Sequence, residues 1–159
     1  EEYLGKYLKH SYLKNPIVYC GNFALNTVLV YYVQEAENAD IKINIDIALP
    51  NEISIKDADL TVLFGNLIEN AIDACENVQK DKRSIELKIH RPNAGSIVFS
   101  IDNTFDGNIK MSGNKFLSTK QNGSGIGIES AKYVVEKYNG DMKIEINDNK
   151  FCVSGVLLQ

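Results

Sequence analysis

The sequence predicts an α/β sandwich of the α+β class, in which a mixed, largely antiparallel sheet carries helices on one side. Helical and strand-like segments are intermixed along the 159 residues, and several strand-like segments follow one another closely enough to form hairpins. A chain of this length buries a core without disulfides, and its 44% hydrophobic and 24% charged residues are those of an ordinary globular protein.

Charge and cysteine content exclude several classes of function. The formal net charge is −4, whereas nucleic acids and anionic membranes are bound mainly through excess Lys and Arg, so we expect no nucleic-acid partner. The longest apolar run, Val28 to Val33, is far shorter than the roughly 18 to 20 residues of a membrane helix. Cys20, Cys75 and Cys152 form no CxxC pair, which argues against a disulfide framework or zinc site and favours a reducing cytosol.

The first third of the chain is expected to form two helices and a strand. Residues 1–14 carry apolar side chains at helical spacing, and this helix should end near Asn15, because the following proline disfavours helix in the residue before it. A second helix is expected over about 22–38. Strict alternation over 41–49 predicts a strand with one buried face.

The strongest helix signal lies over 57–78. Asp57 is placed to cap its first turn. The apolar residues recur at steps of three and four: Leu60, Leu63, Phe64, Leu67, Ile68, Ala71, Ile72 and Cys75. Strands are expected over 84–91 and 96–103, joined by a turn over 92–95 that contains proline, asparagine and glycine.

Residues 104–122 are polar, contain glycine and show no periodicity. This stretch is too long for an ordinary connection, so we expect a functional loop. A helix over about 124–138 and two strands, over 141–147 and 151–158, complete the expected order.

A polar stripe adjoins the apolar stripe of the 57–78 helix. At about 100° per residue, Asn66, Glu69, Asn70 and Asp73 cluster on it. Asparagine is a poor residue inside a helix, because its amide competes with the backbone for hydrogen bonds. Two asparagines one turn apart beside a core stripe suggest amide oxygens directed at a ligand or metal; the alternative is a solvated polar face.

Asn103 ends a predicted strand. Alternation through Phe99 and Ile101 directs its side chain to the apolar face, where an asparagine needs hydrogen-bond partners. Its side-chain oxygen can accept from the exocyclic amine of an adenine. An Asp-Asn pair at a strand end is also a common turn former, so the alternative is that Asp102 and Asn103 only form a turn.

The stretch STKQNGSGIGIES covers residues 118–130. It holds three glycines in five positions: Gly123, Gly125 and Gly127. Just before a helix, such glycines let the backbone approach phosphates, and the helix dipole favours anions. Lys120 and the hydroxyls of Ser118 and Thr119 can reach a terminal phosphate. Neither a Walker loop nor the full Rossmann spacing is present, so the alternative is a loop tip with glycine-assisted helix packing.

In order along the chain, the segments NLIENAIDA, DNTFDG and STKQNGSGIGIES resemble the N, G1 and G2 boxes of the GHKL ATP-binding superfamily, over roughly 22–158. Within it the chain is similar to sensor histidine kinases, particularly the Agr-type peptide-sensing group. The resemblance implies the Bergerat fold and Mg-ATP as ligand. It also implies a catalytic ATP-binding domain over 21–159, preceded over 1–20 by the end of a dimerisation helix and a linker.

The resemblance assigns roles by position. Asn70 is implied as the magnesium ligand and Asn66 as its partner facing the phosphates, both acting in catalysis with Lys120. In the gyrase and Hsp90 branches the earlier position carries a Glu that activates water; Asn66 cannot act as a base, which favours phosphoryl transfer over hydrolysis. Glu69 and Asp73 are implied to support magnesium through water.

The G1 box departs from the family pattern Asp-x-Gly-x-Gly. Asn103 stands where the Asp would sit and Thr104 replaces the first glycine, while the register with Asp102 as the adenine ligand stays open. The resemblance also implies nucleotide contacts from the lid and the helix after it: Ser118, Thr119, Lys120, Gly123, Gly125, Ile126, Gly127 and Ile128.

The acceptor histidine is expected outside this chain, because His10 precedes Ser-Tyr-Leu rather than an acidic residue. The implied partners are the dimerisation and histidine-acceptor domain of the same protein, in a full-length homodimer, and a response regulator of the LytTR type or similar. The domain is expected on the cytoplasmic side of a membrane-anchored sensor. The alternatives are a GHKL protein-serine kinase of the anti-sigma-factor type, against which Asn66 counts, and a degenerate docking module without nucleotide.

Overall fold

The computed structural model describes residues 17–108, 110–112, 115–117 and 126–159, so the helix expected over 1–14 lies outside the described residues. The elements are α2 (Phe23–Asn38), β1 (Lys42–Ala48), α3 (Asp57–Glu76), the 3-10 turn η1 (Lys80–Lys82), β2 (Ser84–Asn93), β3 (Ser96–Thr104), β4 (Lys110–Ser112), β5 (Lys115–Leu117), α4 (Ile126–Lys137), β6 (Asp141–Asn147) and β7 (Lys150–Leu158). Within these ranges no helix is both long and apolar enough to cross a membrane.

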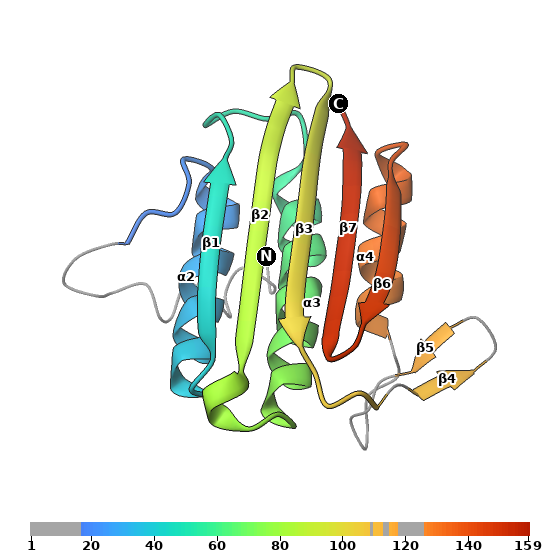
Figure 1. Cartoon of the computed structure of the whole chain (residues 1–159). Helices are drawn as coiled ribbons and strands as arrows, with labels where there is room; N and C mark the ends of the chain where they lie inside the picture. The colour runs from blue at the N-terminus through green and yellow to red at the C-terminus, as the bar shows by residue number, and fades with distance from the viewer. Residues whose placement is uncertain (1–16, 109, 113–114, 118–125) are drawn as a thin grey trace.

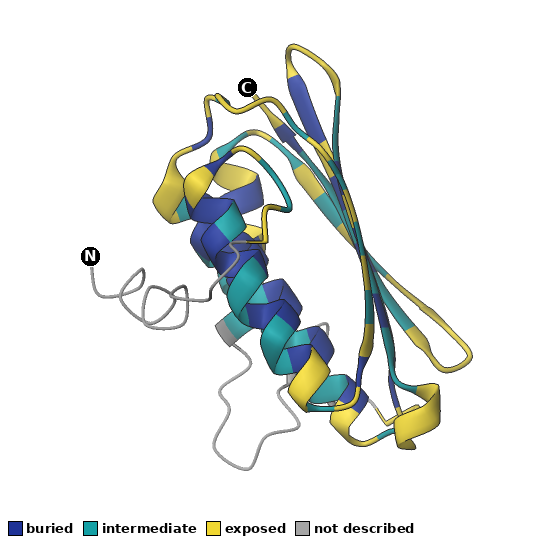
Figure 2. Ribbon diagram, turned by 90° about the vertical axis from the view of Figure 1, so that its left-hand side faces the viewer, coloured by how far each residue is buried: buried dark blue, intermediate teal, exposed yellow. Residues whose placement is uncertain are grey.

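A five-stranded sheet in the order β1-β2-β3-β7-β6 forms one layer (Figure 1). β1 pairs with β2 in parallel, and every other pair of neighbours is antiparallel. The helices α2, α3 and α4 cover one face of this sheet and leave the other open (Figure 2). The expected α+β sandwich with a mixed, largely antiparallel sheet is therefore confirmed. Inside the stretch 104–122, expected as a loop, β4 and β5 form a short separate hairpin.

The apolar stripe of α3 supplies much of the core. All of its predicted residues are buried. Phe64 meets Phe99 of β3 edge to face, with ring centroids 5.6 Å apart. Gly155 of β7, the cross-strand neighbour of Phe99, leaves room for that ring, because a Cβ there would overlap it. Burying one large apolar side chain contributes about 1.5–3 kcal/mol, so this stripe fixes α3 on the sheet.

The prediction that Asp57 caps α3 is wrong. The N-cap is Lys56, which makes no side-chain capping hydrogen bond, and Asp57 is the first residue of the helix. The Asp57 carboxylate accepts instead from Asn22 Nδ2 at 3.3 Å. Asn22 itself caps α2, since its Oδ1 accepts from the Leu25 N–H at 2.9 Å. Asn22 therefore connects the starts of α2 and α3. Because the two residues lie 35 positions apart in the sequence, no local pattern predicts this contact.

The hairpin turn is shorter than the sequence suggests. β2 runs to Asn93 and so includes Pro92, which was placed in the turn. The reversal lies at Ala94 and Gly95, where Asn93 Oδ1 accepts from the Gly95 N–H at 2.9 Å. The β2–β3 register shifts between His90 and Asn93, and such an irregularity accommodates a proline that cannot donate to the ladder.

Arg83 joins the C-terminal ends of two helices to the start of β2. Its Nη1 donates to the carbonyl of Ala39, after α2, at 2.6 Å. Its Nη2 donates to the carbonyl of Glu76 at 2.8 Å and its Nε to that of Val78 at 2.9 Å, at and after the end of α3. Carbonyls at helix C-termini lack intrahelical donors and favour a nearby positive charge, so this guanidinium satisfies both ends at once.

Asp59, Lys137 and Tyr138 lock the start of α3 to the end of α4. Asp59 Oδ2 lies 2.8 Å from Lys137 Nζ and accepts from the Tyr138 hydroxyl at 2.6 Å. The same hydroxyl accepts from the Lys56 N–H at 3.0 Å. Burial alone raises the pKa of Asp59, but the hydrogen bonds from Lys137 and Tyr138 and the charge of Lys137 outweigh it, so this pKa lies below its ordinary value.

We expect Arg83→Met to lower the free energy of unfolding by about 2 kcal/mol, because it removes three charge-assisted hydrogen bonds and leaves their carbonyl acceptors unpaired. Urea denaturation followed by circular dichroism measures the change. The control Lys82→Met removes the same charge from an exposed neighbour and should change stability by less than about 0.5 kcal/mol. Equal losses in both variants would show that net charge, not the bonds, is responsible.

The depressed pKa of Asp59 makes stability depend on pH in one direction. The folded state favours the carboxylate, so its stabilising effect is present above the unfolded pKa, near 3.8, and is lost as pH falls through the lower folded pKa. Asp59→Asn should therefore be less stable than wild type at pH 7, and the difference should shrink below pH 4. Denaturation midpoints of both proteins at pH 7 and below pH 4 test this, and the exposed Asp141→Asn is the control. A stability difference between wild type and Asp59→Asn that is the same at both pH values would contradict it.

Candidate functional site

The elements that carry the described residues of the three motifs come together at one edge of the molecule, the lower edge in Figure 1. The C-terminal half of α3, the end of β3 and the first turn of α4 meet there. α3 and α4 run antiparallel, since Asp59 pairs with Lys137 at one end, while Gly127 at the start of α4 lies against Asn70 at the other. Tertiary packing thus brings the first and third sequence motifs into contact.

Gly127 touches both asparagines of the predicted polar stripe. A Cβ built on it would lie 2.9 Å from Asn70 Nδ2 and 3.3 Å from both Asn66 Oδ1 and Asn70 Oδ1. The first turn of α4 therefore lies close against the two amides, and the absence of a side chain at Gly127 permits this approach. Backbone N–H groups in a first helical turn have no intrahelical acceptors, and the start of α4 places such groups next to the two amides.

The two amides differ in how they are satisfied. Asn66 Nδ2 donates to the carbonyl of Val62, one turn earlier, at 2.7 Å, which turns Asn66 Oδ1 toward Gly127. Asn70 Nδ2 is buried and finds no hydrogen-bond partner among the described residues. A buried donor without a partner costs about 1–3 kcal/mol. Such a donor beside a helix N-terminus fits a ligand that brings its own oxygen acceptors.

The structure places Asn103 and Asp102 on opposite faces of the sheet. Asn103 is buried on the helix-covered face with Phe99 and Ile101, as alternation predicts. Its Nδ2 donates to the carbonyl of Thr104 at 3.0 Å. Asp102 lies on the open face, where its carboxylate takes a hydrogen bond from Cys152 of β7; burial and this bond raise the pKa of the Cys152 thiol. Asp102 is therefore turned away from the edge where α3 and α4 meet.

Thr104 is a residue whose role sequence reasoning missed. Its Oγ1 accepts from the Ser84 N–H at 3.0 Å, and its carbonyl accepts from Cys75 Sγ at 3.3 Å. Burial raises the pKa of the Cys75 thiol, which therefore stays protonated and able to donate. Because Thr104 is 6% exposed, its side chain is built into the junction of α3 and the sheet rather than into the open edge.

The spacing of the G1 pattern also needs correction. Counted from Asn103, Asp-x-Gly-x-Gly places its glycines at 105 and 107, so Phe105 rather than Thr104 replaces the first. Phe105 is buried and packs edge to face against Phe151 of β7, with centroids 6.2 Å apart. Gly107 keeps the second glycine and has φ +83°, a backbone conformation that side chains rarely adopt.

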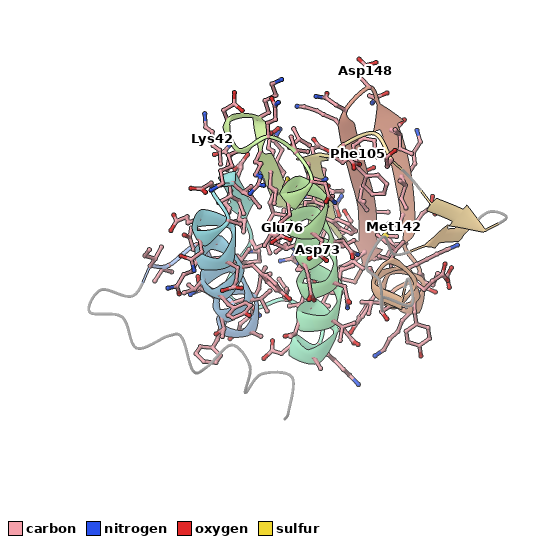
Figure 3. All side chains as sticks on the ribbon, turned by 90° about the horizontal axis from the view of Figure 1, so that it is seen from below. Lys42, Asp73, Glu76, Phe105, Met142 and Asp148 are labelled. Atoms are coloured by element: carbon pink, nitrogen blue, oxygen red, sulfur yellow. The ribbon has the colours of Figure 1, made fainter. Side chains whose placement is uncertain are left out.

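Glu69 of α3 faces the helix α2. Glu69 Oε2 accepts from the hydroxyl of Tyr32 on α2 at 3.3 Å. Figure 3 looks at this end of the molecule from below and labels the half-buried Asp73 on α3 and Phe105 just after β3. Within the described part of the chain, no three His, Cys, Asp or Glu side chains form a group that could hold a metal ion.

Several predicted site residues lie outside the described residues: Ser118, Thr119, Lys120, Gly123 and Gly125. Of the remaining residues of the third motif, Ile126 begins α4 and Gly127 makes the contacts given above. Ile128 is half-buried and packs against the hydrophobic core, which anchors the first turn of α4.

Comparisons with known proteins agree with this geometry. The sequence model of the GHKL domain matches residues 55–159. The catalytic domain of histidine kinase ThkA, nucleotide-free, matches with TM-score 0.66 at 18% identity, over 85% of this chain and 90% of that one. The mycobacterial sensor histidine kinase MprB matches with TM-score 0.62 at 14% identity, over 85% of this chain and 93% of that one. Full-length ShkA in complex with AMPPNP matches with TM-score 0.64 at 14% identity, over 97% of this chain and 33% of that one. No curated protein matches the sequence.

At such identities these likenesses show the fold. The expected Bergerat arrangement is confirmed by them, since each of these three structures is a histidine kinase or its catalytic domain.

Gly127→Ala tests the contact between α4 and the two amides. We expect the variant to fold, with a stability within about 1 kcal/mol of wild type, because the overlapping atoms are the movable ends of side chains and Ala favours helix. The Asn66 and Asn70 side-chain NH2 signals should shift in ¹⁵N–¹H spectra. Gly95→Ala, where the nearest atom lies at 3.5 Å, is the control. Unchanged NH2 signals in Gly127→Ala would show that the contact is absent in solution.

Proposed function

We propose, from the premise that this chain belongs to the GHKL domain family, that it is the catalytic ATP-binding domain of a sensor histidine kinase. In this proposal it binds Mg-ATP and donates the γ-phosphate to a histidine on a dimerisation domain. The observation that carries the proposal is the contact of Gly127 with Asn66 and Asn70, which joins the two motifs expected at the phosphates.

The residues present fit Mg-ATP. The unpaired Asn70 Nδ2 offers a donor to a phosphate oxygen, and amide oxygens are ligands that Mg²⁺ accepts alongside substrate phosphates. Asn70 would hold the metal through Oδ1, with Asn66 as its partner one turn earlier and Asp73 supporting through water. The bound group supplies the transferable phosphoryl group and a cation that neutralises charge on its oxygens.

The chain's own residues position and neutralise rather than activate water. Neither Asn66 nor Asn70 can take a proton as a general base, which suits phosphoryl transfer to a protein acceptor better than hydrolysis. The N-terminal end of α4, beside Gly127, favours anions through its dipole and through N–H groups that have no intrahelical acceptors. Lys120, Ser118, Thr119, Gly123 and Gly125 are proposed to complete the phosphate contacts.

We propose Asn103 rather than Asp102 as the residue that recognises adenine. Asn103 faces the helix-covered side and Asp102 the open side of the sheet. The Asn103 Oδ1 can accept a hydrogen bond from the exocyclic amine of adenine, since its Nδ2 already donates to Thr104. Ile126 and Ile128 would contribute through the backbone of the first turn of α4.

The proposal extends to the phosphate acceptor, the domain limits and the full-length protein. The similarity to the Agr-type group suggests a response regulator of the LytTR type as the final phosphate acceptor. Residues 1–20 would be the end of a dimerisation helix and its linker, and 21–159 the catalytic domain. The full-length protein would be a homodimeric, membrane-anchored sensor with this domain on the cytoplasmic side.

Titration with a fluorescent ATP analogue tests the proposal. Binding should require Mg²⁺, be abolished by EDTA and be reversed by unlabelled ATP. Asn70→Ala and Asn103→Ala should each weaken binding about tenfold or more, because each loses a hydrogen bond or metal ligand inside a buried site.

Asn44→Ala is the matched control, because Asn44 is exposed on β1. It should bind as wild type does. If wild type binds no nucleotide at millimolar concentration, the kinase proposal fails and a docking module is the better account. Binding that survives Asn70→Ala unchanged would remove that residue from the site.

A further inference from the structure

We infer that the outer edge of β1 binds the same edge of a second copy of this chain, so that two sheets join into one across a two-fold axis. β1 is an end strand of the five-stranded sheet, at the left in Figure 1, and β2 is its one neighbour in the described part of the chain. The contact would lie outside the proposed nucleotide site and would not depend on nucleotide.

The backbone of β1 offers hydrogen-bonding groups at this edge. The Lys42 N–H donates to the Arg83 carbonyl, on the β2 side, at 3.1 Å. Because the N–H and C=O groups of successive strand residues point to opposite sides, those of Ile43, Ile45 and Ile47 point away from β2, where no described residue pairs with them. β1 pairs with β2 in continuous register and contains no proline. Such an edge is a template for another strand.

The sequence of β1, KINIDIA, is complementary to itself in one antiparallel register. The free backbone groups of two such edges meet when odd-numbered residues face odd-numbered residues, for example Ile43 and the partner's Ile45. That register places Lys42 opposite the partner's Asp46, and does so twice because the axis is two-fold. It also places Asn44 opposite the partner's Asn44 on the axis. Two facing amides can each donate and accept, so they form reciprocal hydrogen bonds.

Neighbouring registers lack this match. A shift of two residues in one direction would set Asp40, just before β1, against the partner's Asp46. Like charges directly opposite each other destabilise a strand pair. A shift in the other direction would set Lys42 against the partner's Ala48. The register centred on Asn44 is the one that pairs opposite charges, so charge selects a single arrangement.

The side chains of β1 are available for these contacts. Lys42 is exposed and has no ion-pair partner among the described residues. Asp46 is also exposed, and its Oδ2 lies 3.1 Å from His90 Nε2, which leaves further acceptor positions on the carboxylate. On the helix-covered face, Ile43 and Ile45 are half-buried against the core, and a second strand would cover more of their apolar surface.

The other edge strand, β6, carries charges that neutralise one another. Lys143 Nζ lies 2.7 Å from Glu145 Oε1 on the same strand. A partner strand there would gain little from charge, because both groups are already paired. β6 therefore supplies a matched control for β1.

Sedimentation velocity of the whole chain, at protein concentrations from about 5 to about 500 μM, tests the contact. We expect wild type to pass from monomer to dimer as the concentration rises. Lys42→Glu should raise the dissociation constant of the dimer about tenfold or more, because it replaces two attractive pairs by two repulsive ones. Lys42→Glu combined with Asp46→Lys exchanges the charges and should restore dimerisation. Lys143→Glu makes the same change in charge on β6 and should leave the dissociation constant unchanged.

Asn44→Cys tests the register. Directly opposite residues that share no ladder hydrogen bonds have Cα atoms about 4.5 Å apart, within the range of a disulfide. Under oxidising conditions this variant should form a covalent dimer joined at position 44, and peptide mapping separates that bond from any made by Cys20, Cys75 or Cys152. Ala48→Cys, on the same exposed face of β1, is the control. Its two copies would lie about 27 Å apart and should not join.

Several results would overturn the β1 contact. One is a monomer at every concentration, and another is a dimer that Lys42→Glu does not weaken, because it is then held elsewhere. Assemblies larger than a dimer would also do so, since two edges paired about a two-fold axis leave neither free. Failure of the charge exchange to restore dimerisation, or equal cross-linking of Asn44→Cys and Ala48→Cys, would refute the register. The proposed function is measured by nucleotide binding and stands whichever result is found.

Discussion

The packing of α3 across the sheet is the constraint on which the rest of the structure depends. Its apolar stripe is buried from Leu60 to Cys75, which fixes the rotation of the helix about its own axis. Once that rotation is fixed, Asn66 and Asn70 must emerge beside α4 and Glu69 beside α2. The position of the candidate site is thus a consequence of core burial, because a helix cannot turn its polar stripe without exposing its apolar one.

The contact between α3 and α4 has one end that stabilises the fold and one end where a buried donor costs free energy. At the start of α3, Asp59 is paired with Lys137 and Tyr138 and its pKa is depressed. At the other end, Asn70 keeps a buried donor without a described partner. A fold tolerates an unpaired donor of this kind when the gain comes from a ligand, and the remainder of the helix pair stabilises the arrangement.

The end of β3 shows how a departure from a family pattern can be compensated. Phe105 fills a glycine position, and its ring packs on Phe151 instead of occupying the open edge. In the proposed register of the G1 pattern, Asn103 stands at the aspartate position, and the carbonyl of Thr104 supplies the acceptor that an amide, unlike a carboxylate, requires. Cys75 extends this network to α3, so the strand end and the helix that bear the candidate site are one connected unit.

The sequence alone determined the apolar stripe of α3, the alternation that buries Asn103 and the fold class, because helical and strand periodicities are properties of the local backbone. The family came from a resemblance carried by three motifs and their order along the chain. Sequence reasoning misplaced the cap of α3, since the Asp57 carboxylate is taken by Asn22, a residue distant in sequence. Only tertiary structure placed Gly127 against Asn66 and Asn70, directed Arg83 to two helix ends and oriented the Asn103 amide. Those contacts depend on how helices and strands pack together, and residue spacing within one segment carries no information about that.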